Sequence, residues 1–205
     1  MRDALVASAG WLPLLLALLL VLGWYLSYSA ARLDRLHHKV ESARASLDAQ
    51  LVRRCVAALE LAPFLDPASG LLLADAAAAA LEAGERQALD AGLGADPGAD
   101  LEEAESDLTR ALEAAFDDPR HVEALARDPN ALDALAVLRQ ACERVGLARR
   151  FHNEAVAQAQ RVRRKRVVRW ARLAGHAAWP VTVEIDDALP SGLGPGLDAA
   201  AARTG

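Results

Sequence analysis

Aromatic residues make up only 4% of this 205-residue chain, although 53% of its residues are hydrophobic. The core of a β-sandwich needs aromatic and β-branched side chains, so this composition disfavours such a fold. Alanine and leucine dominate instead, and small side chains let helices approach one another closely. The sequence therefore predicts an all-α protein with a helical bundle.

Cysteine is also scarce. The chain has two cysteines, Cys55 and Cys142, each on an apolar helical face. No CxxC pair and no Cys/His spacing suited to zinc occurs. We expect two buried free thiols in a reducing compartment, no metal site and no cofactor.

Sequence signatures of catalysis are missing. The chain has no P-loop, no HExxH and no GxSxG, and no glycine-rich loop follows a strand. His121 and His176 are isolated in the sequence, and His37 and His38 follow the apolar N-terminal stretch. We predict that the chain is not an enzyme. An enzyme with an unrecognised site is an alternative, which a deep polar pocket with a perturbed carboxylate would support.

Lysine is nearly absent, since only Lys39 and Lys165 are lysines among 23 basic residues. With so much alanine, this indicates GC-rich coding, so arginine alone is weak evidence of recognition. Charge is also distributed unevenly. Residues 60–135 carry 18 acidic and 4 basic side chains, whereas residues 136–172 carry 2 acidic and 11 basic ones. Such opposite fields indicate intramolecular pairing or two surfaces for different partners.

The most prominent feature is the uncharged stretch of residues 4–28. A helix of this length, at about 1.5 Å per residue, crosses a hydrocarbon core of about 30 Å. Arg32, Arg35 and Lys39 follow the stretch, and the positive-inside rule then places the C-terminal side in the cytoplasm. We predict a single-pass protein of the cell membrane with residues 1–3 outside.

A cleavable signal peptide is the alternative to an anchor. Ser29-Ala30-Ala31 would serve as its cleavage site. The nearly neutral start of the chain and the length of the apolar stretch favour the anchor.

The anchor runs directly into a helical repeat with no glycine- or proline-rich linker. Apolar residues recur every three or four positions up to residue 62. Asp-Pro pairs at residues 66, 96, 118 and 128 then mark new helix starts, because Asp caps a helix and Pro suits its first position. We predict an up-down antiparallel bundle of about four long helices in the cytoplasmic residues 29–175, with the last helix running from Pro129 to about residue 174.

Residues 176–205 follow as a C-terminal segment that we predict to be largely disordered. Within it, residues 181–185 alternate like a strand but lack a partner to pair with.

Helix lengths place polar residues of the first and last long helices at matching heights above the membrane. We predict an inter-helix polar cluster centred on Asp48 and Asn153. Its members are Asp48, Gln50, Arg53, Arg54, Arg150, His152 and Asn153.

An even number of helices also returns the basic end of the last helix to the bilayer. Near an anionic leaflet each cationic side chain contributes about 1 kcal/mol. The alternatives are a solvated helix end, pairing with the acidic middle helices, and nucleic-acid binding, which the sparse aromatics and the acidic remainder disfavour. The possible lipid-facing residues are Arg161, Arg163, Arg164, Lys165, Arg166, Arg169, Trp170 and Arg172.

Two segments resemble the signature segments of the LemA family. Residues 43–54 (ARASLDAQLVRR) are similar to its "aW-x-x-ID-x-qL-x-RR" stretch, and residues 147–156 (LARRFHNEAV) to its "R-x-YN-x-a-V" stretch. Arg44 stands where the family has tryptophan, residues 56–60 lack its "LIPNL", and Ala159-Gln160 stands for its second "YN". The resemblance is to a divergent, actinobacterial type of member. It implies a bacterial single-pass membrane protein with a cytoplasmic helical bundle and implies no reaction.

We therefore expect a structural or interaction role. The expected partners are the membrane and unidentified proteins, and a homo-oligomer stays open.

Overall fold

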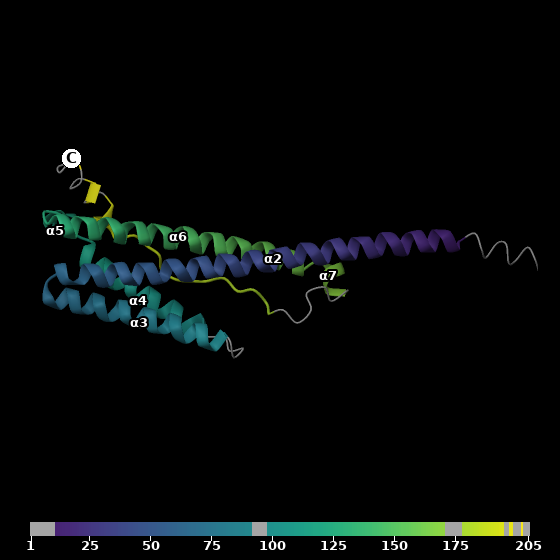
Figure 1. The fold of residues 1–205 in the computed structure, drawn as a ribbon, viewed down its shortest axis with the longest axis horizontal. Helices are drawn as coiled ribbons and strands as arrows, with labels where there is room; N and C mark the ends of the chain where they lie inside the picture. Colours follow the sequence, from purple (N-terminus) through teal and green to yellow (C-terminus); the bar gives the residue numbers. More distant parts are fainter. Residues whose placement is uncertain (1–10, 92–97, 171–177, 195–196, 199–201, 203–205) are drawn as a thin grey trace, which may run out of the picture. The chain divides into compact units, whose positions relative to one another are not determined.

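The computed structural model describes residues 11–91, 98–170, 178–194, 197–198 and 202. Its six α-helices are α2 (Leu12–Leu61), α3 (Pro67–Ala91), α4 (Gly98–Phe116), α5 (Pro119–Leu125), α6 (Pro129–Arg163) and α7 (Arg166–Trp170). Two short 3₁₀ helices are also present: η1 (Ala62–Phe64) lies between α2 and α3, and η2 (Ser191–Leu193) follows α7. The described residues contain no strand (Figure 1). The predicted all-α class is confirmed.

The start signals read from the sequence act as helix caps. Asp66 Oδ1 accepts hydrogen bonds of 3.1 Å from the backbone N–H groups of Ala68 and Ser69 at the start of α3. Asp118 and Asp128 accept equivalent bonds of 2.9 Å at the starts of α5 and α6. Three of the four predicted Asp-Pro joints are thus confirmed, and the pair at residues 96–97 lies outside the described residues.

The chain divides into two compact units, of which the first comprises residues 1–42 and 154–181. In this unit α2 and α6 run antiparallel, because Leu33 packs with Val162 while Lys39, further along α2, donates to Gln158 at 3.3 Å. Val168 of α7 completes the small apolar core with Leu33. The predicted antiparallel return of the last helix to the part of α2 that follows the apolar stretch is confirmed.

The last helix is shorter than its sequence predicts. α6 ends at Arg163 rather than near residue 174, and a turn at residues 164–165 leads into α7. The turn brings Val168 onto Leu33 and Val162, and the burial of Val168 compensates for the interrupted helix. The end of the predicted long helix, residues 171–174, lies outside the described residues.

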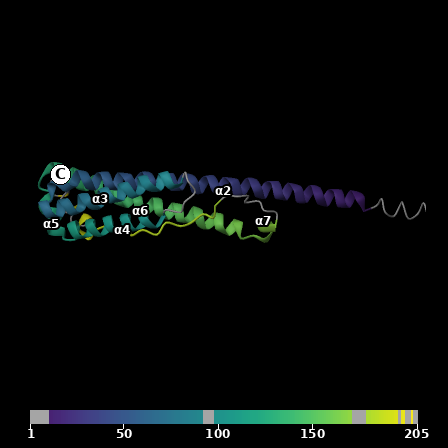
Figure 2. The same cartoon turned by 90° about the horizontal axis from the view of Figure 1, so that it is seen from below.

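The second unit comprises residues 43–153 and 182–205. α3 and α4 lie side by side (Figures 1 and 2), and their buried faces join those of α2 and α6 in a core of small and aliphatic side chains. Phe116 is the one aromatic residue buried among the described residues of this core. Cys55 and Cys142 are free and buried in it, as predicted.

Residues 182–194 of the C-terminal segment form part of this unit rather than of a disordered tail. Residues 182–190 are extended and continue into η2; we call residues 182–194 the strap (Figure 2). Val183 and Ile185 are buried in a core cluster with Leu47 and Val145, and Leu193 is buried against the main core. The prediction of disorder is therefore wrong for the strap, because alternating apolar residues gain burial between helices.

Candidate functional site

A buried ion pair lies inside the second unit. Arg54 of α2 and Glu105 of α4 have side chains that are each only 1% exposed, and they form a salt bridge. Arg54 also donates to the hydroxyl of Thr109 at 3.0 Å and to the backbone carbonyl of Glu105 at 2.9 Å. Two neighbouring helices are thereby joined by a charge-assisted network, which is stronger than neutral hydrogen bonds.

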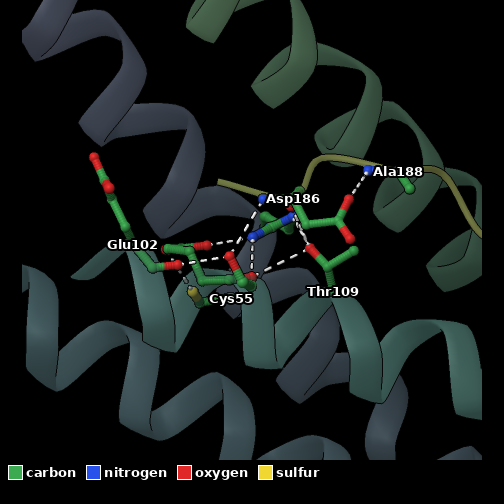
Figure 3. Close-up of polar contacts among 8 residues, drawn as sticks. Cys55, Glu102, Thr109, Asp186 and Ala188 are labelled. Atoms are coloured by element: carbon green, nitrogen blue, oxygen red, sulfur yellow. Dashed lines mark hydrogen bonds and ion pairs between the residues drawn. The ribbon is translucent and has the colours of Figure 1, made fainter. Parts of the chain in front are cut away.

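This network continues to the strap. The Thr109 hydroxyl donates to the backbone carbonyl of Asp186 at 2.6 Å, and Figure 3 shows Thr109 facing the strap from α4. Cys55 lies on the other side of the ion pair, with its Sγ 3.8 Å from Glu105 Oε1. Burial, with the Glu105 charge, raises the pKa of the Cys55 thiol to about 12. Burial likewise raises the pKa of Cys142 to about 11, so both thiols stay protonated and unreactive at neutral pH.

Side chains, rather than a neighbouring strand, satisfy the strap backbone. Asn153 of α6 accepts from Val183 N–H at 2.9 Å and donates to the Val183 carbonyl at 3.1 Å. Glu102 and Ser106 of α4 accept from the N–H groups of Glu184 and Asp186 at 3.1 and 3.2 Å (Figure 3). Residues 181–185 alternate like a strand, and the sequence offered no strand to pair with them. These side-chain hydrogen bonds take the place of that strand.

An ion pair fixes the strap to α6 as well. Arg149 forms two hydrogen bonds of 3.0 and 2.8 Å to the carboxylate of Asp187. Both side chains are largely buried, at 22% and 17% exposure. Bidentate geometry of this kind makes an arginine–carboxylate pair specific as well as strong.

The structure separates the predicted polar cluster into several small contacts. Asp48 pairs with Arg44 on its own helix, Nε to Oδ1 at 3.0 Å, rather than with Asn153. Partial burial raises the pKa of the Asp48 carboxyl, while Arg44 and, more weakly, buried His152 oppose the shift. Gln50 and Arg53 form a surface contact at 3.5 Å, and Arg150 is exposed.

Sequence reasoning missed the partners of this site. Glu105 stands at a core position of α4 between Leu101 and Leu108, and Arg54 stands likewise beside Cys55 in α2. Opposite charges interrupting two apolar faces were the signal that could have paired them. Glu102, Ser106 and Thr109 are polar residues spaced three or four positions apart on α4, and this spacing was the signal that could have predicted their contact with the strap.

The basic end of α6 lies in the first unit. Arg161, Arg164, Lys165, Arg166, Arg169 and Trp170 are exposed, and Arg172 lies outside the described residues. Arg163 is half-buried: its guanidinium lies 5.0 Å from the ring centre of Trp179, and it donates to the Ala178 carbonyl. Within the described residues, no carboxylate forms an ion pair with the exposed cations of this end.

A groove between α3 and α4 has a volume of about 580 Å³. Alanines line its floor, and Leu72 at its edge is 69% exposed. Asp75, Asp100, Glu103 and Asp107 line it together with Arg86 and Arg110. Four carboxylates against two arginines make this groove acidic.

No protein-family model, curated protein or solved structure matches this chain. The described fold is that of a helical protein in which one helix among the described residues, α2, is long and apolar enough to cross a membrane.

Proposed function

We propose that this chain is a single-pass membrane protein of LemA-like type whose helical bundle has a structural or interaction role in the cytoplasm. The observation that carries the proposal is the N-terminal part of α2. Its large apolar residues between Trp11 and Leu22 are all at least 39% exposed, and no part of the most apolar stretch is covered by the rest of the chain. Exposed apolar surface of this extent is stable in a hydrocarbon environment.

The residues next to this stretch support the proposed orientation. Arg32, Arg35 and Lys39 come within one to three helical turns of Tyr28, and cationic residues are retained on the cytoplasmic side. Trp24 and Tyr28 stack with ring centres 6.2 Å apart and supply the aromatic belt that is typical of a membrane interface.

Carbonate washing of membranes from cells that produce the full chain tests the anchor. The chain should stay in the membrane pellet, and a variant that lacks residues 1–28 should be released. Protease added to right-side-out vesicles should leave the bundle intact, and it should digest the bundle once the vesicles are opened. Release of the full chain by carbonate, or digestion in sealed vesicles, would contradict the anchor or its orientation respectively.

The acidic groove between α3 and α4 supports an interaction role. Its apolar floor and its carboxylates suit a basic amphipathic helix of a partner protein. A photo-crosslinking residue placed at Leu72 should give one discrete product in cells, and that product should contain a basic segment. The same residue at Leu147, an exposed leucine of α6, is the matched control. Equal products from both positions would count against the groove.

A further inference from the structure

Three cationic side chains gather in one cleft of the first unit. Arg32 of α2, Arg161 of α6 and Lys165, which follows α6, line a cleft of about 280 Å³. Gln158, Leu36 and Val162 complete its lining. The sequence separates Arg32 from the other two cations by more than 120 residues, so only the antiparallel return of α6 brings them together.

The cationic groups of this cleft have no ion-pair partner in the described part of the chain. Among the described residues, no carboxylate lies within ion-pair distance of Arg32, Arg161 or Lys165. Arg54 and Arg149, by contrast, each bind a carboxylate. Three neighbouring cations repel one another, and an anion placed between them relieves this repulsion.

The cleft also lies at a defined height on α2. Arg32 comes four residues after Tyr28, about 6 Å along the helix axis. If Tyr28 marks the edge of the hydrocarbon core, as the proposed anchor requires, the three cations lie at the level of lipid phosphates. Packing of Val162 and Val168 against Leu33 fixes the end of α6 at this height.

α7 carries a second group of exposed cationic side chains in the same unit. Trp170 is 78% exposed and lines a shallow cleft with Arg166 and Arg169. An exposed tryptophan beside cations is typical of a segment that lies in the headgroup region.

We infer that Arg32, Arg161 and Lys165 form a binding site for the phosphate of an anionic phospholipid in the cytoplasmic leaflet. The inference rests on the proposed anchor for the source of the phosphate. The two helices contribute cations to one headgroup, so the bound lipid stabilises the pairing of α2 with the end of α6. Anionic lipid therefore has two roles for this unit: it is a structural ligand, and it is part of the surrounding membrane.

Native mass spectrometry of the purified full chain in a neutral detergent tests the site. With phosphatidylglycerol and phosphatidylcholine supplied together, the chain should retain phosphatidylglycerol preferentially. The triple variant Arg32→Gln/Arg161→Gln/Lys165→Gln should bind phosphatidylglycerol roughly a hundredfold more weakly, because three cations are lost at about 1 kcal/mol each. The charge-conserving variant Arg32→Lys/Arg161→Lys/Lys165→Arg should keep most of the preference.

A matched control removes three exposed arginines elsewhere, Arg127→Gln/Arg144→Gln/Arg150→Gln, and should change the affinity less than twofold. An equal loss in both triple variants would overturn the site in favour of a net-charge effect. Displacement of the lipid by inorganic phosphate, or by a DNA oligonucleotide at equal charge, would overturn the assignment to lipid. Equal helix content of all variants by circular dichroism shows that loss of binding is not loss of folding.

Failure of this inference is distinguishable from failure of the anchor. The binding assay takes place in detergent and does not need a bilayer, whereas carbonate extraction does not depend on Arg32, Arg161 or Lys165. Lipid preference in a chain that carbonate releases would retain the cleft and reject the anchor.

Discussion

Arg54 and Glu105 place two opposite charges in a core that consists mainly of alanine, leucine and other apolar side chains. Desolvation of two ions is expensive, and their attraction offsets it only with good geometry and further hydrogen bonds. Arg54 gains those bonds from Thr109 and from the backbone of Glu105. We expect the pair to contribute more to the alignment of α2 with α4 than to stability.

The first prediction concerns this pair. Glu105→Gln leaves the Arg54 charge buried without a counter-ion, and we expect the free energy of unfolding to fall by about 3–5 kcal/mol. Urea titration of the full chain in detergent, followed by circular dichroism, measures the change. Asp107→Asn, which removes the exposed partner of Arg110 on the same helix, should cost less than about 1 kcal/mol.

A double variant separates the charge from the packing. Arg54→Met/Glu105→Leu removes both ions and should recover most of the lost stability. If the double variant is as unstable as Glu105→Gln, the cost comes from shape rather than from an unpaired charge.

Asp48 provides the second prediction, because folding raises the pKa of its carboxyl. The folded chain then binds this proton more tightly than the unfolded chain does. The resulting stabilisation is present in full below the ordinary pKa of 3.8 and is lost as the pH rises through the raised pKa of the folded state. At neutral pH the charged Asp48 therefore opposes folding.

Asp48→Asn removes this titration. The melting temperature of the variant should exceed that of the original chain at about pH 7, and the advantage should shrink as the pH falls toward the ordinary carboxyl pKa. Melting curves of both proteins over this range measure the difference. A variant that melts lower at neutral pH would mean that the bond to Arg44 outweighs desolvation.

Among the elements, the strap depends most on residues distant in sequence. Its backbone hydrogen bonds go to Asn153 on α6 and to Glu102, Ser106 and Thr109 on α4. Gly192 in η2 is equally constrained, since a Cβ there would come within 2.2 Å of the Phe116 carbonyl oxygen. The strap therefore depends on both helices for its position.

The third prediction concerns this attachment. Asn153→Ala leaves the Val183 amide and carbonyl without their partner, which we expect to cost about 1–3 kcal/mol. Hydrogen–deuterium exchange should become faster at residues 182–187 and change little in α3. Gln140→Ala, an exposed position on the same helix, is the matched control. Unchanged exchange in the strap of the Asn153 variant would show that apolar burial alone holds it.

Helices with a strong local signal were predictable from the sequence. Asp-Pro pairs and three-to-four spacing are local, and they located the starts of α3, α5 and α6. The strap was not predictable in the same way, because Val183 and Ile185 are buried in a cluster with side chains of α2, α3, α4 and α6. The break after Arg163 depends on Val168 meeting Leu33, a contact with another helix that no local pattern encodes.

The residues of the candidate site were likewise predictable only in part. Arg54, His152 and Asn153 were singled out from their heights on two helices, and all are buried or half-buried. Their actual partners were missed because Glu105, Thr109 and Val183 lie on elements outside the two helices compared. Helix length fixes a height along the bundle, but it does not fix which neighbour faces a given side chain.

For the whole molecule, the account depends on α2 being one helix from Leu12 to Leu61, apolar and uncovered at its start and packed at its end. In the proposed function this one helix serves both as the anchor and as the first helix of the bundle. Arg32 of the inferred lipid site lies four residues past Tyr28 on this helix, so the proposed anchor would bring the site to the headgroup level.

A nitroxide scan along residues 20–42 of the full chain in phospholipid vesicles tests this most directly, by the accessibility of each label to oxygen. We predict high oxygen accessibility at residues 20–26, a fall near Tyr28 to Arg32, and a period of about 3.6 residues through the whole range. Uniformly aqueous values at residues 20–26, or loss of the helical period between residues 28 and 34, would contradict the account.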